Sequence, residues 1–406
     1  MNLFLHLAWR NLWRNKRRTL ISTSSVFFAV LLALIMRSMQ NGSYDYMIQS
    51  SVGLYLGYIQ IHGEGYWDKR SIDQSIVVEA EKLQSFASNP QVTHVVPRLE
   101  SFVLLSKGVS TKVAQVIGID PPREDAMTGL AHRIHAGRFL QKNDTGILLG
   151  TGLAKFLNAH CGDSVVIYGQ GFHGVTAAAN VPVVGILKFP LPDLDNTMSY
   201  LSLEYAQWLF DAPGRVTSVA LMISSQAQLA NVRSQIERMA GEKTEVMTWQ
   251  EMMPELVQSI QADSAGGILM LLILYIVIGF GIFGTIMMMT NERSREFGVL
   301  ISIGMKRWKL ITVTVMETIM ISLLGAGVGM VVGIPVLWYL YLHPIPLTGD
   351  AAAAMVAYGL EPIIPFSMAP GIFIAQTVIV FSLAVVCAMY PLLVIRKLKP
   401  VAALRS

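Results

Sequence analysis

The sequence of 406 residues has few charged side chains. Only 14% are Asp, Glu, Lys or Arg, whereas 53% are hydrophobic. A soluble domain carries roughly a quarter charged residues, so this composition excludes an ordinary soluble protein and indicates a membrane protein. The only two cysteines are Cys161, in a stretch of ordinary polarity, and Cys387, in an apolar run. They are not expected to meet, and no disulfide framework is available. The net charge is only +4, and we expect no nucleic-acid partner.

Motifs for nucleotide binding and for hydrolysis are also missing. The chain has no GxxxxGK[ST] loop, no nucleophile elbow, no HExxH and no CxxC. We therefore expect no catalytic residue and no cofactor or metal bound by this chain. His132 and His135 are spaced for one helix face, but no ligand partner is evident nearby, so a metal site is the weaker interpretation. Asp193 and Asp195 stand in a proline-rich stretch that turn chemistry explains better than catalysis.

Lysine and arginine are absent from 343–367 but cluster in 1–19, 291–309 and 396–405. Basic flanks mark the cytoplasmic side of a membrane, so both termini and the central loop are predicted inside. A cleaved signal peptide is the alternative for the N-terminus. It is disfavoured because Arg37 follows the first apolar run with no small-residue cleavage site. The first run is therefore predicted to stay as a transmembrane helix.

The predicted fold is an α+β membrane protein with four transmembrane helices in a one-plus-three arrangement. The large domain between the first two helices should mix strands (58–62, 101–105, 111–119, 147–150, 164–168) with helices (78–87, 153–158, 227–239). A Gly- and Ala-rich loop over 169–180 is predicted as a mobile hairpin tip. The predicted segments are a cytoplasmic amphipathic helix over 1–18, transmembrane helices over 19–40, 263–290, 310–342 and 370–395, an extracytoplasmic domain over 41–262, a cytoplasmic helix over 291–309, an outer loop over 343–369 and a cytoplasmic tail over 396–406.

The stretch from Asn291 to Leu310 is a short charged segment between two apolar runs. Glu292 and Glu296 are four residues apart, and so are Phe297 and Ile301. On a helix, this spacing places the charged side chains along one side and the apolar side chains along another. The pattern predicts an amphipathic helix lying along the membrane surface. The alternative is a loop that only fixes the topology.

The third apolar run carries one acid and a ridge of glycines. Glu317 is predicted to be a buried acid bonded to a neighbouring helix or reaching back to Lys309 or Arg307; a coupling or proton-relay group is the alternative. The ridge predicts close approach of another helix, with packing within one protomer against the fourth span preferred; the glycines of the second span could serve a dimer seam. The ridge consists of Gly325, Gly329 and Gly333.

These motifs together resemble the MacB/FtsX-type ABC transporter permeases. The pattern runs through Glu292, Arg293, Glu296, Gly298, Leu300, Gly304, Glu317, Gly325, Gly329 and Gly333. The opening LAWRNLWRNKRRT, the closing stretch from Lys399 to Arg405, and the run around GRF, ILLGTGLAKFL, CGD and VPVVGIL are similar to the same family. The resemblance covers the whole chain.

The resemblance implies a mechanotransmitter. Two permeases, identical or different, would pair, and separate cytoplasmic ATPase subunits that bind ATP and Mg would dock on them. The outer domain would be of the two-part Porter and Sabre type. The 291–309 segment would be the coupling helix that seats in the ATPase. Its contact residues would be Glu292, Arg293, Arg295, Glu296, Phe297, Gly298, Leu300, Gly304, Lys306 and Arg307.

Chain size is most similar to the LolC/LolE-type lipoprotein-releasing permeases of the bacterial inner membrane. This implies a lipoprotein or another lipidated substrate. LolC-type proteins hook a periplasmic carrier with a longer, proline-containing hairpin, whereas 168–180 is short and lacks proline, so action with or without a carrier stays open. Depth and chemistry place substrate contact in a cavity between the first and second spans of two protomers, at their outer ends. The candidates are Phe27, Leu31, Ile35, Ile268, Leu272 and Tyr275.

Three other functions are compatible with these residues. The first is an efflux permease for amphipathic toxins or peptides. The second is an FtsX-like signalling mechanotransmitter that controls a cell-wall enzyme and transports nothing. The third is a membrane-anchored binding domain without an ATPase, which leaves the charged segment at 291–309 unexplained.

Overall fold

The computed structural model describes residues 2–14, 16–357 and 361–398. Contacts within this part of the chain form two compact units. One unit holds Met1–Tyr46, Ser259–Pro346 and Ile363–Ser406, and the other holds Met47–Gln258 and Leu347–Pro362. Most of the predicted tail, including the closing motif from Lys399 to Arg405, lies outside the described residues.

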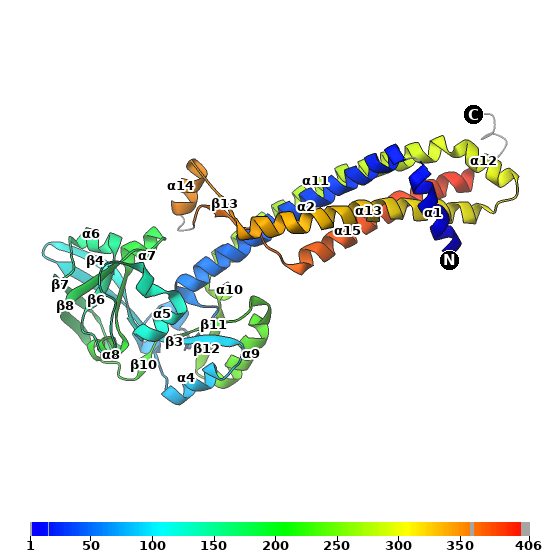
Figure 1. Cartoon of the computed structure of the whole chain (residues 1–406). Helices are drawn as coiled ribbons and strands as arrows, with labels where there is room; N and C mark the ends of the chain where they lie inside the picture. Colours follow the sequence, from blue (N-terminus) through cyan, green and yellow to red (C-terminus); the bar gives the residue numbers. More distant parts are fainter. Residues whose placement is uncertain (1, 15, 358–360, 399–406) are drawn as a thin grey trace. The chain divides into compact units, whose positions relative to one another are not determined.

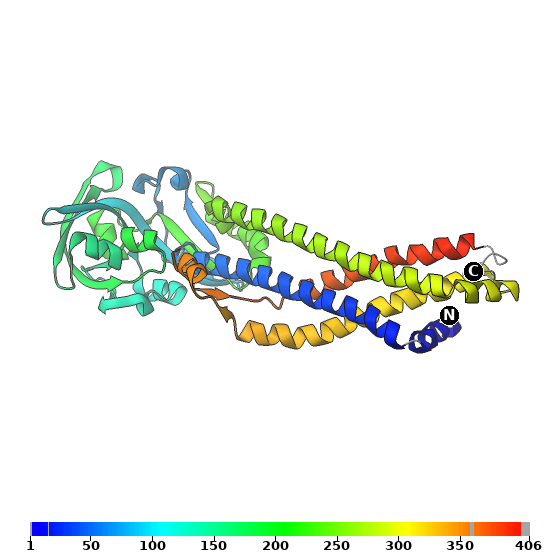
Figure 2. The same ribbon diagram turned by 90° about the horizontal axis from the view of Figure 1, so that it is seen from above.

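Four long helices build the first unit, and both views show them side by side (Figure 1, Figure 2). They are α2 (Lys16–Ser51), α11 (Pro254–Glu292), α13 (Arg307–Leu342) and α15 (Pro370–Lys397). Among the described residues, four helical stretches are long and apolar enough to cross a membrane, and they lie in these helices. The predicted one-plus-three order of spans is confirmed. Two helices are longer than their predicted spans, since α2 continues to Ser51 and α11 begins at Pro254.

Two short helices accompany the long ones. Helix α1 (Asn2–Arg14) buries Leu12 against Met289 of α11 and Ile321 of α13. Helix α12 (Ser294–Ser302) lies between α11 and α13 in the sequence. Proline opens α15 at Pro370, where its missing N–H would have had no helical partner.

A mixed sheet forms the centre of the second unit. Its order is β12-β1-β11-β3-β4-β9-β6-β8-β5, and β7 pairs with both β3 and β8. The strands are β1 (Ile59–Gly63), β3 (Val92–Lys107), β4 (Ser110–Ile119), β5 (Ile134–Gly137), β6 (Ile147–Gly150), β7 (Ser164–Gln170), β8 (Thr176–Leu187), β9 (Met198–Ser202), β11 (Ser218–Ile223) and β12 (Thr244–Thr248). The fold therefore contains the mixed α/β domain predicted between the first and second spans.

The sheet has two parts that share the long strand β3. In one part, β3, β4, β9, β6, β8 and β7 pair in a closed ring. Ring closure leaves few free edges. Inward side chains such as Val103, Val116 and Ile167 pack there with α6 (Thr151–Leu157) and α8 (Leu203–Leu209). In the other part, β11, β1 and β12 extend from β3, and α9 (Leu229–Ala240) contacts β12.

The segment over 169–180 is a hairpin with long strands, so the predicted loop is wrong for most of its length. Strands β7 and β8 stay in register from Ser164↔Pro182 to Gln170↔Thr176. Only five residues, 171–175, turn the chain. The small side chains that suggested a loop instead fit a tightly packed strand, because Ala177 lies in the core of the ring.

The remaining elements complete the two units. Strand β13 (Ile345–Pro346) pairs with β14 (Ile363–Ile364). Strand β2 (Ile76–Val77) pairs with β10 (Arg215–Val216). The other described helices are α3 (Tyr66–Lys69), α4 (Ala80–Ala87), α5 (Pro121–Thr128), α7 (Pro192–Thr197), α10 (Trp249–Met252) and α14 (Asp350–Ala357).

Candidate functional site

The segment predicted as one helix over Asn291–Leu310 is broken into three pieces. Helix α11 ends at Glu292, α12 covers Ser294–Ser302, and α13 begins at Arg307. Gly304 has a φ of +100°, which side chains other than glycine rarely adopt, and it ends the helical path after α12. The prediction of a single helix is therefore wrong, although a short amphipathic helix exists at its centre.

The inner face of α12 is fixed to the spans by apolar packing. Phe297 packs with Leu310 at the start of α13 and Ile395 near the end of α15. Gly298 is buried beside it. These residues face the helix bundle, so Phe297 and Gly298 cannot belong to an exposed contact surface as predicted.

A buried ion pair joins the start of α12 to the third span. Arg293 Nη1 donates to Glu317 Oε2 at 2.7 Å, and the two side chains are 11% and 2% exposed. Glu317 is a buried acid, as predicted, but it bonds to the residue between α11 and α12 and not to one within a neighbouring helix. Its partner is Arg293 and not Arg307, because Arg307 donates instead to the main-chain oxygens of Arg396 and Leu398. Arg293 is correspondingly removed from the predicted contact surface.

The other face of α12 carries an exposed ion pair to the N-terminal helix. Arg14 Nη2 donates to both carboxylate oxygens of Glu296, at 2.8 and 2.9 Å. The hydrogen bond from Arg14 is the main reason why the pKa of Glu296 lies below its usual value. Arg293 also reaches Glu296, at 3.4 Å. Four charged side chains thus connect α1, α12 and α13 in sequence: Arg14, Glu296, Arg293 and Glu317.

Seven of the ten predicted contact residues remain on the surface of the described unit. The exposed members are Glu292, Arg295, Glu296, Leu300, Gly304, Lys306 and Arg307. They combine charges of both signs with one apolar side chain at the end of the bundle. Such a mixed surface is suited to contact with a polar protein surface.

The glycine ridge of α13 packs within one chain, as predicted, but against a different helix. A Cβ on Gly325 would lie 2.6 Å from Val26 Cβ, and one on Gly329 would lie 3.0 Å from Val30 Cβ. A Cβ on Gly333 would likewise lie 3.0 Å from Leu34. The glycines therefore bring the backbones of α13 and α2 together. The predicted partner, the fourth span, is wrong for this ridge.

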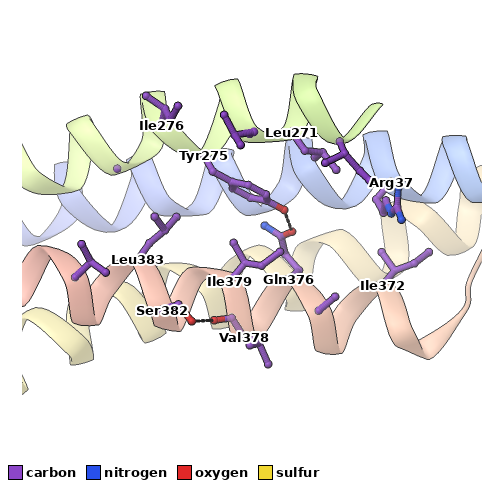
Figure 3. Close-up of a pocket in the computed structure, with 15 residues that line it drawn as sticks. Arg37, Leu271, Tyr275, Ile276, Ile372, Gln376, Val378, Ile379, Ser382 and Leu383 are labelled. Carbon is purple, nitrogen blue, oxygen red and sulfur yellow. Dashed lines mark hydrogen bonds between the residues drawn. The ribbon is translucent and has the colours of Figure 1, made fainter. Parts of the chain in front are cut away.

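The six predicted substrate-contact residues do not line one cavity in a single chain. Ile268, Leu272 and Tyr275 of α11 line a groove of about 670 Å³ against α15 (Figure 3). The three from the first span, namely Phe27, Leu31 and Ile35, do not contribute to this groove. Leu31 approaches Gly333 of α13, and Ile35 packs on the core of the bundle. The groove instead contains Arg37 and Gln376, which sequence reasoning did not single out.

Two candidate sites in the outer domain have structural explanations. His132 lies in a short 3-10 turn over Leu130–Arg133, whereas His135 lies in β5, so they do not share a helix face. Asp195 accepts hydrogen bonds from the backbone N–H groups of Thr151, Gly152 and Phe189, at 3.1, 2.7 and 3.0 Å. It therefore satisfies the free N–H groups at the start of α6. Among the described residues, no three His, Cys, Asp or Glu side chains are grouped as metal ligands would be.

A buried charged cluster in the outer domain gave no signal in the sequence. Arg98 of β3 donates through Nε and Nη2 to the two carboxylate oxygens of Glu124 on α5, at 2.8 and 2.7 Å, and both side chains are almost fully buried. The Glu124 charge holds the pKa of Arg98 above its usual value despite burial. Strand alternation could not have indicated this cluster, because all side chains from Val95 to Ser101 of β3 are buried.

Four apolar spans, a large mixed domain after the first span and a short charged helix after the second together define a membrane permease of one-plus-three topology. Residues 19–239 match the MacB-like periplasmic core domain, and residues 268–400 match the FtsX-like permease C-terminal domain. The chain belongs to the MacB/FtsX-type family of ABC transporter permeases, as the resemblance implied.

Individual relatives are distant. An uncharacterized ABC transporter permease of Mycobacterium tuberculosis is 25% identical over 249 residues, which cover 59% of this chain and 27% of that protein. The lipoprotein-releasing system transmembrane protein LolC of Xylella fastidiosa is 23% identical over 264 residues, 62% of each chain. The chain thus spans less than two thirds of the length of these relatives. The crystal structure of the periplasmic region of MacB from Actinobacillus actinomycetemcomitans is 17% identical, with a TM-score of 0.38, and covers 54% of this chain and 98% of that one.

Proposed function

We propose that this chain is the permease subunit of an ABC transporter that works by mechanotransmission. A separate cytoplasmic ATPase, which binds ATP and Mg, docks on the exposed face of α12. Two permease chains pair, and the spans pass the movement on to the outer domain. The work done is the release of a lipoprotein, or another lipidated substrate, from the inner membrane. Both termini lie in the cytoplasm and the large domain lies in the periplasm.

The structure of α12 carries the proposal. Its outer face is charged and exposed, whereas its inner face is fixed to α13 and α15 by Phe297. The buried pair between Arg293 and Glu317 adds a second, polar attachment to α13. A displacement of α12 by a partner is therefore transmitted to two spans, since packed side chains move together. A loop that only fixed the topology would not need these two attachments.

Support for a lipidated substrate comes from a relative. The Xylella fastidiosa protein is named for lipoprotein release, and it matches 62% of this chain. The basic residues of 1–19 and the basic flank of α13 support the orientation, because positive charge marks the cytoplasmic side. A carrier that docks on the hairpin of β7 and β8 is not part of the proposal.

The docking proposal is tested by affinity purification of the full chain from native membranes in mild detergent, followed by mass spectrometric identification of bound proteins. Wild type should retain an ABC ATPase. The double variant Glu292→Lys, Glu296→Lys should lose it, because it reverses two charges on the exposed face. Arg14→Gln is the matched control, since it removes the ion pair of Glu296 but leaves the carboxylate in place.

Each outcome has a definite meaning. Loss of the ATPase in the double variant but not in Arg14→Gln supports docking on α12. Retention in all three proteins refutes docking there. A wild-type sample without any ATPase, but with a folded outer domain, would favour the membrane-anchored binding domain. A lipoprotein among the bound proteins supports the proposed substrate, whereas a cell-wall hydrolase in its place would favour signalling.

A further inference from the structure

The groove between α11 and α15 has a polar lining that the packing of the chain does not explain. Gln376 of α15 is only 4% exposed. Its Oε1 accepts from the hydroxyl group of Tyr275 at 2.6 Å, but its Nε2 is buried without a partner among the described residues (Figure 3). A buried donor without an acceptor costs about 1–3 kcal/mol. Its presence in the wall of a groove indicates a ligand that supplies an acceptor.

A positively charged side chain lines the same groove. Arg37 of α2 lines it, and its Nη1 donates to Gln40 Oε1 at 2.7 Å. Gln40 is held in turn by the backbone oxygen of Asp263, at 3.3 Å. No described carboxylate lies within 4.0 Å of Arg37, and no described lining residue is acidic. An arginine in a span is costly unless an anion or water compensates its charge.

The rest of the groove is apolar and elongated. Along α15 it runs from Ile372 to Val386, 14 residues on, which is roughly 21 Å at 1.5 Å per residue. One leaflet of a bilayer has about 15 Å of hydrocarbon, so the groove is long enough for an acyl chain that spans its leaflet. Ile276, Ile379 and Leu383 give it an aliphatic lining. The volume of about 670 Å³ is typical of a ligand site.

We propose that this groove binds one anionic diacyl phospholipid of the surrounding bilayer. The phosphate contacts Arg37, an ester carbonyl accepts from Gln376 Nε2, and an acyl chain lies along α15. Helices α2, α11 and α15 then share one ligand. This site is separate from the ATPase surface and does not depend on the transported substrate.

Two other occupants fit the groove less well. A second copy of the chain would present an exposed face of a span, such as Leu269, Ile273 and Val277 of α11, and these side chains have no acceptor. The acyl chains of a lipidated substrate would bring carbonyl groups but no phosphate for Arg37. An anionic phospholipid supplies both an acceptor and a negative charge.

The test is native mass spectrometry of the full chain in mild detergent, with phosphatidylglycerol or phosphatidylethanolamine added at equal concentration. Wild type should hold one phosphatidylglycerol per chain at detergent levels that strip other lipids. Arg37→Gln should weaken this binding at least about tenfold, the lower bound for losing a hydrogen bond to a charged group. Gln376→Leu removes a hydrogen bond between neutral groups and should weaken it about two- to tenfold. Arg37→Lys keeps the charge and should keep most of the preference for phosphatidylglycerol.

Two controls use groups in the same groove whose bonding is already complete. The hydroxyl group of Ser382 donates to the main-chain oxygen of Val378, so Ser382→Ala should bind lipid like wild type. Tyr275→Phe leaves the donor of Gln376 in place and should also retain the lipid. Equal binding of both lipids by wild type, or unchanged binding in Arg37→Gln and Gln376→Leu, would overturn the proposal. A lipidated peptide or a second chain recovered in the groove in place of phospholipid would do the same.

Discussion

Removal of one member of the Arg293–Glu317 pair should loosen α12 from the spans. The Nη1–Oε2 distance is 2.7 Å, and Glu317 is only 2% exposed. Opposite charges about 4 Å apart attract by about 4 kcal/mol at an effective dielectric constant of 20, but the loss of hydration offsets much of this gain. Deleting Arg293 leaves the Glu317 charge buried and uncompensated, which typically costs 3–5 kcal/mol. The cost should appear in the local opening of α12, because Arg293 is the residue immediately before it.

Four variants separate the attraction between the two charges from the cost of burying an unpaired charge. Arg293→Met leaves the Glu317 charge buried without a partner, so it should cost about 3–5 kcal/mol. Glu317→Leu should cost less, because Arg293 keeps its contact with Glu296 at 3.4 Å. The double variant leaves no charge and should cost about 1 kcal/mol or less, since apolar replacements of a buried pair are often neutral. Glu317→Gln keeps an acceptor for Arg293 and should lie between wild type and Glu317→Leu.

Hydrogen–deuterium exchange of the amides of Ser294–Ser302 measures this opening in the full chain. A cost of 3–5 kcal/mol corresponds to exchange at least about a hundredfold faster, at a factor of ten per 1.4 kcal/mol. Arg14→Gln is the control, because its partner Glu296 is 49% exposed and such pairs contribute at most about 1 kcal/mol. The reasoning is refuted if the two single variants exchange like wild type, or if the double variant exchanges as fast as the sum of the single costs requires.

Three further predictions concern packing, protonation and a helix cap, each measured by thermal unfolding of the full chain. Gly325→Ala should destabilise the bundle by about 1–3 kcal/mol through overpacking. Gly327→Ala is the control and should be neutral or slightly stabilising, because no atom lies within 4 Å of its added Cβ. Equal effects of the two substitutions would contradict the close packing at Gly325. Burial and the Arg70 charge lower the pKa of His62 to about 3, below the unfolded value of 6.5. As the pH falls, the unfolded chain therefore binds the proton before the folded chain does. The free energy of unfolding present at pH 7 is lost as pH falls through 6.5 towards 3, by about 2 kcal/mol at pH 5. His62→Phe should remove this part of the pH dependence, and an unchanged profile would refute the prediction. Asp195→Ala should cost about 2 kcal/mol by leaving three N–H groups without an acceptor, while the exposed Asp193→Ala should stay within about 0.5 kcal/mol; a similar loss in both would exclude the capping role.

Periodicity and charge were enough to predict the spans and five of the ten strands in the outer-domain sheet, namely β1, β3, β4, β6 and β7. Long uncharged runs indicate spans in lipid, and the alternation at the start of Thr111–Ile119 indicates a strand, although its last four residues are all buried. The long strands of the hairpin of β7 and β8 were not predicted, because small residues do not distinguish a flexible loop from a strand that packs closely. The signal that could have shortened the helix over 291–309 was Gly304, since a glycine followed by a new basic stretch is a typical helix end.

The partners of the predicted residues could not be read from the sequence. The glycine spacing of α13 predicts close approach of some helix, but the apolar faces of the spans are chemically alike. The choice of α2 depends on the whole arrangement of the bundle. Glu317 posed the same difficulty, because its partner Arg293 is 24 residues away and reaches it only after α11 ends and the chain turns. Gln376 gave no signal either, since an orphaned amide is visible only once its neighbours are placed.

The two ion pairs of α12 differ in strength, and this difference has a consequence for coupling. The Arg293–Glu317 pair is buried and holds α12 to α13, whereas the Arg14–Glu296 pair is exposed on both sides and contributes little. If an ATPase docks on the exposed face, it can take over Glu296 from Arg14 at a cost of at most about 1 kcal/mol. The buried pair and Phe297 stay intact during that exchange. This exchange releases α1 from α12 alone, because Leu12 still holds α1 against Met289 of α11 and Ile321 of α13. Docking can therefore break the contact between α1 and α12 without weakening the path through which force reaches α13.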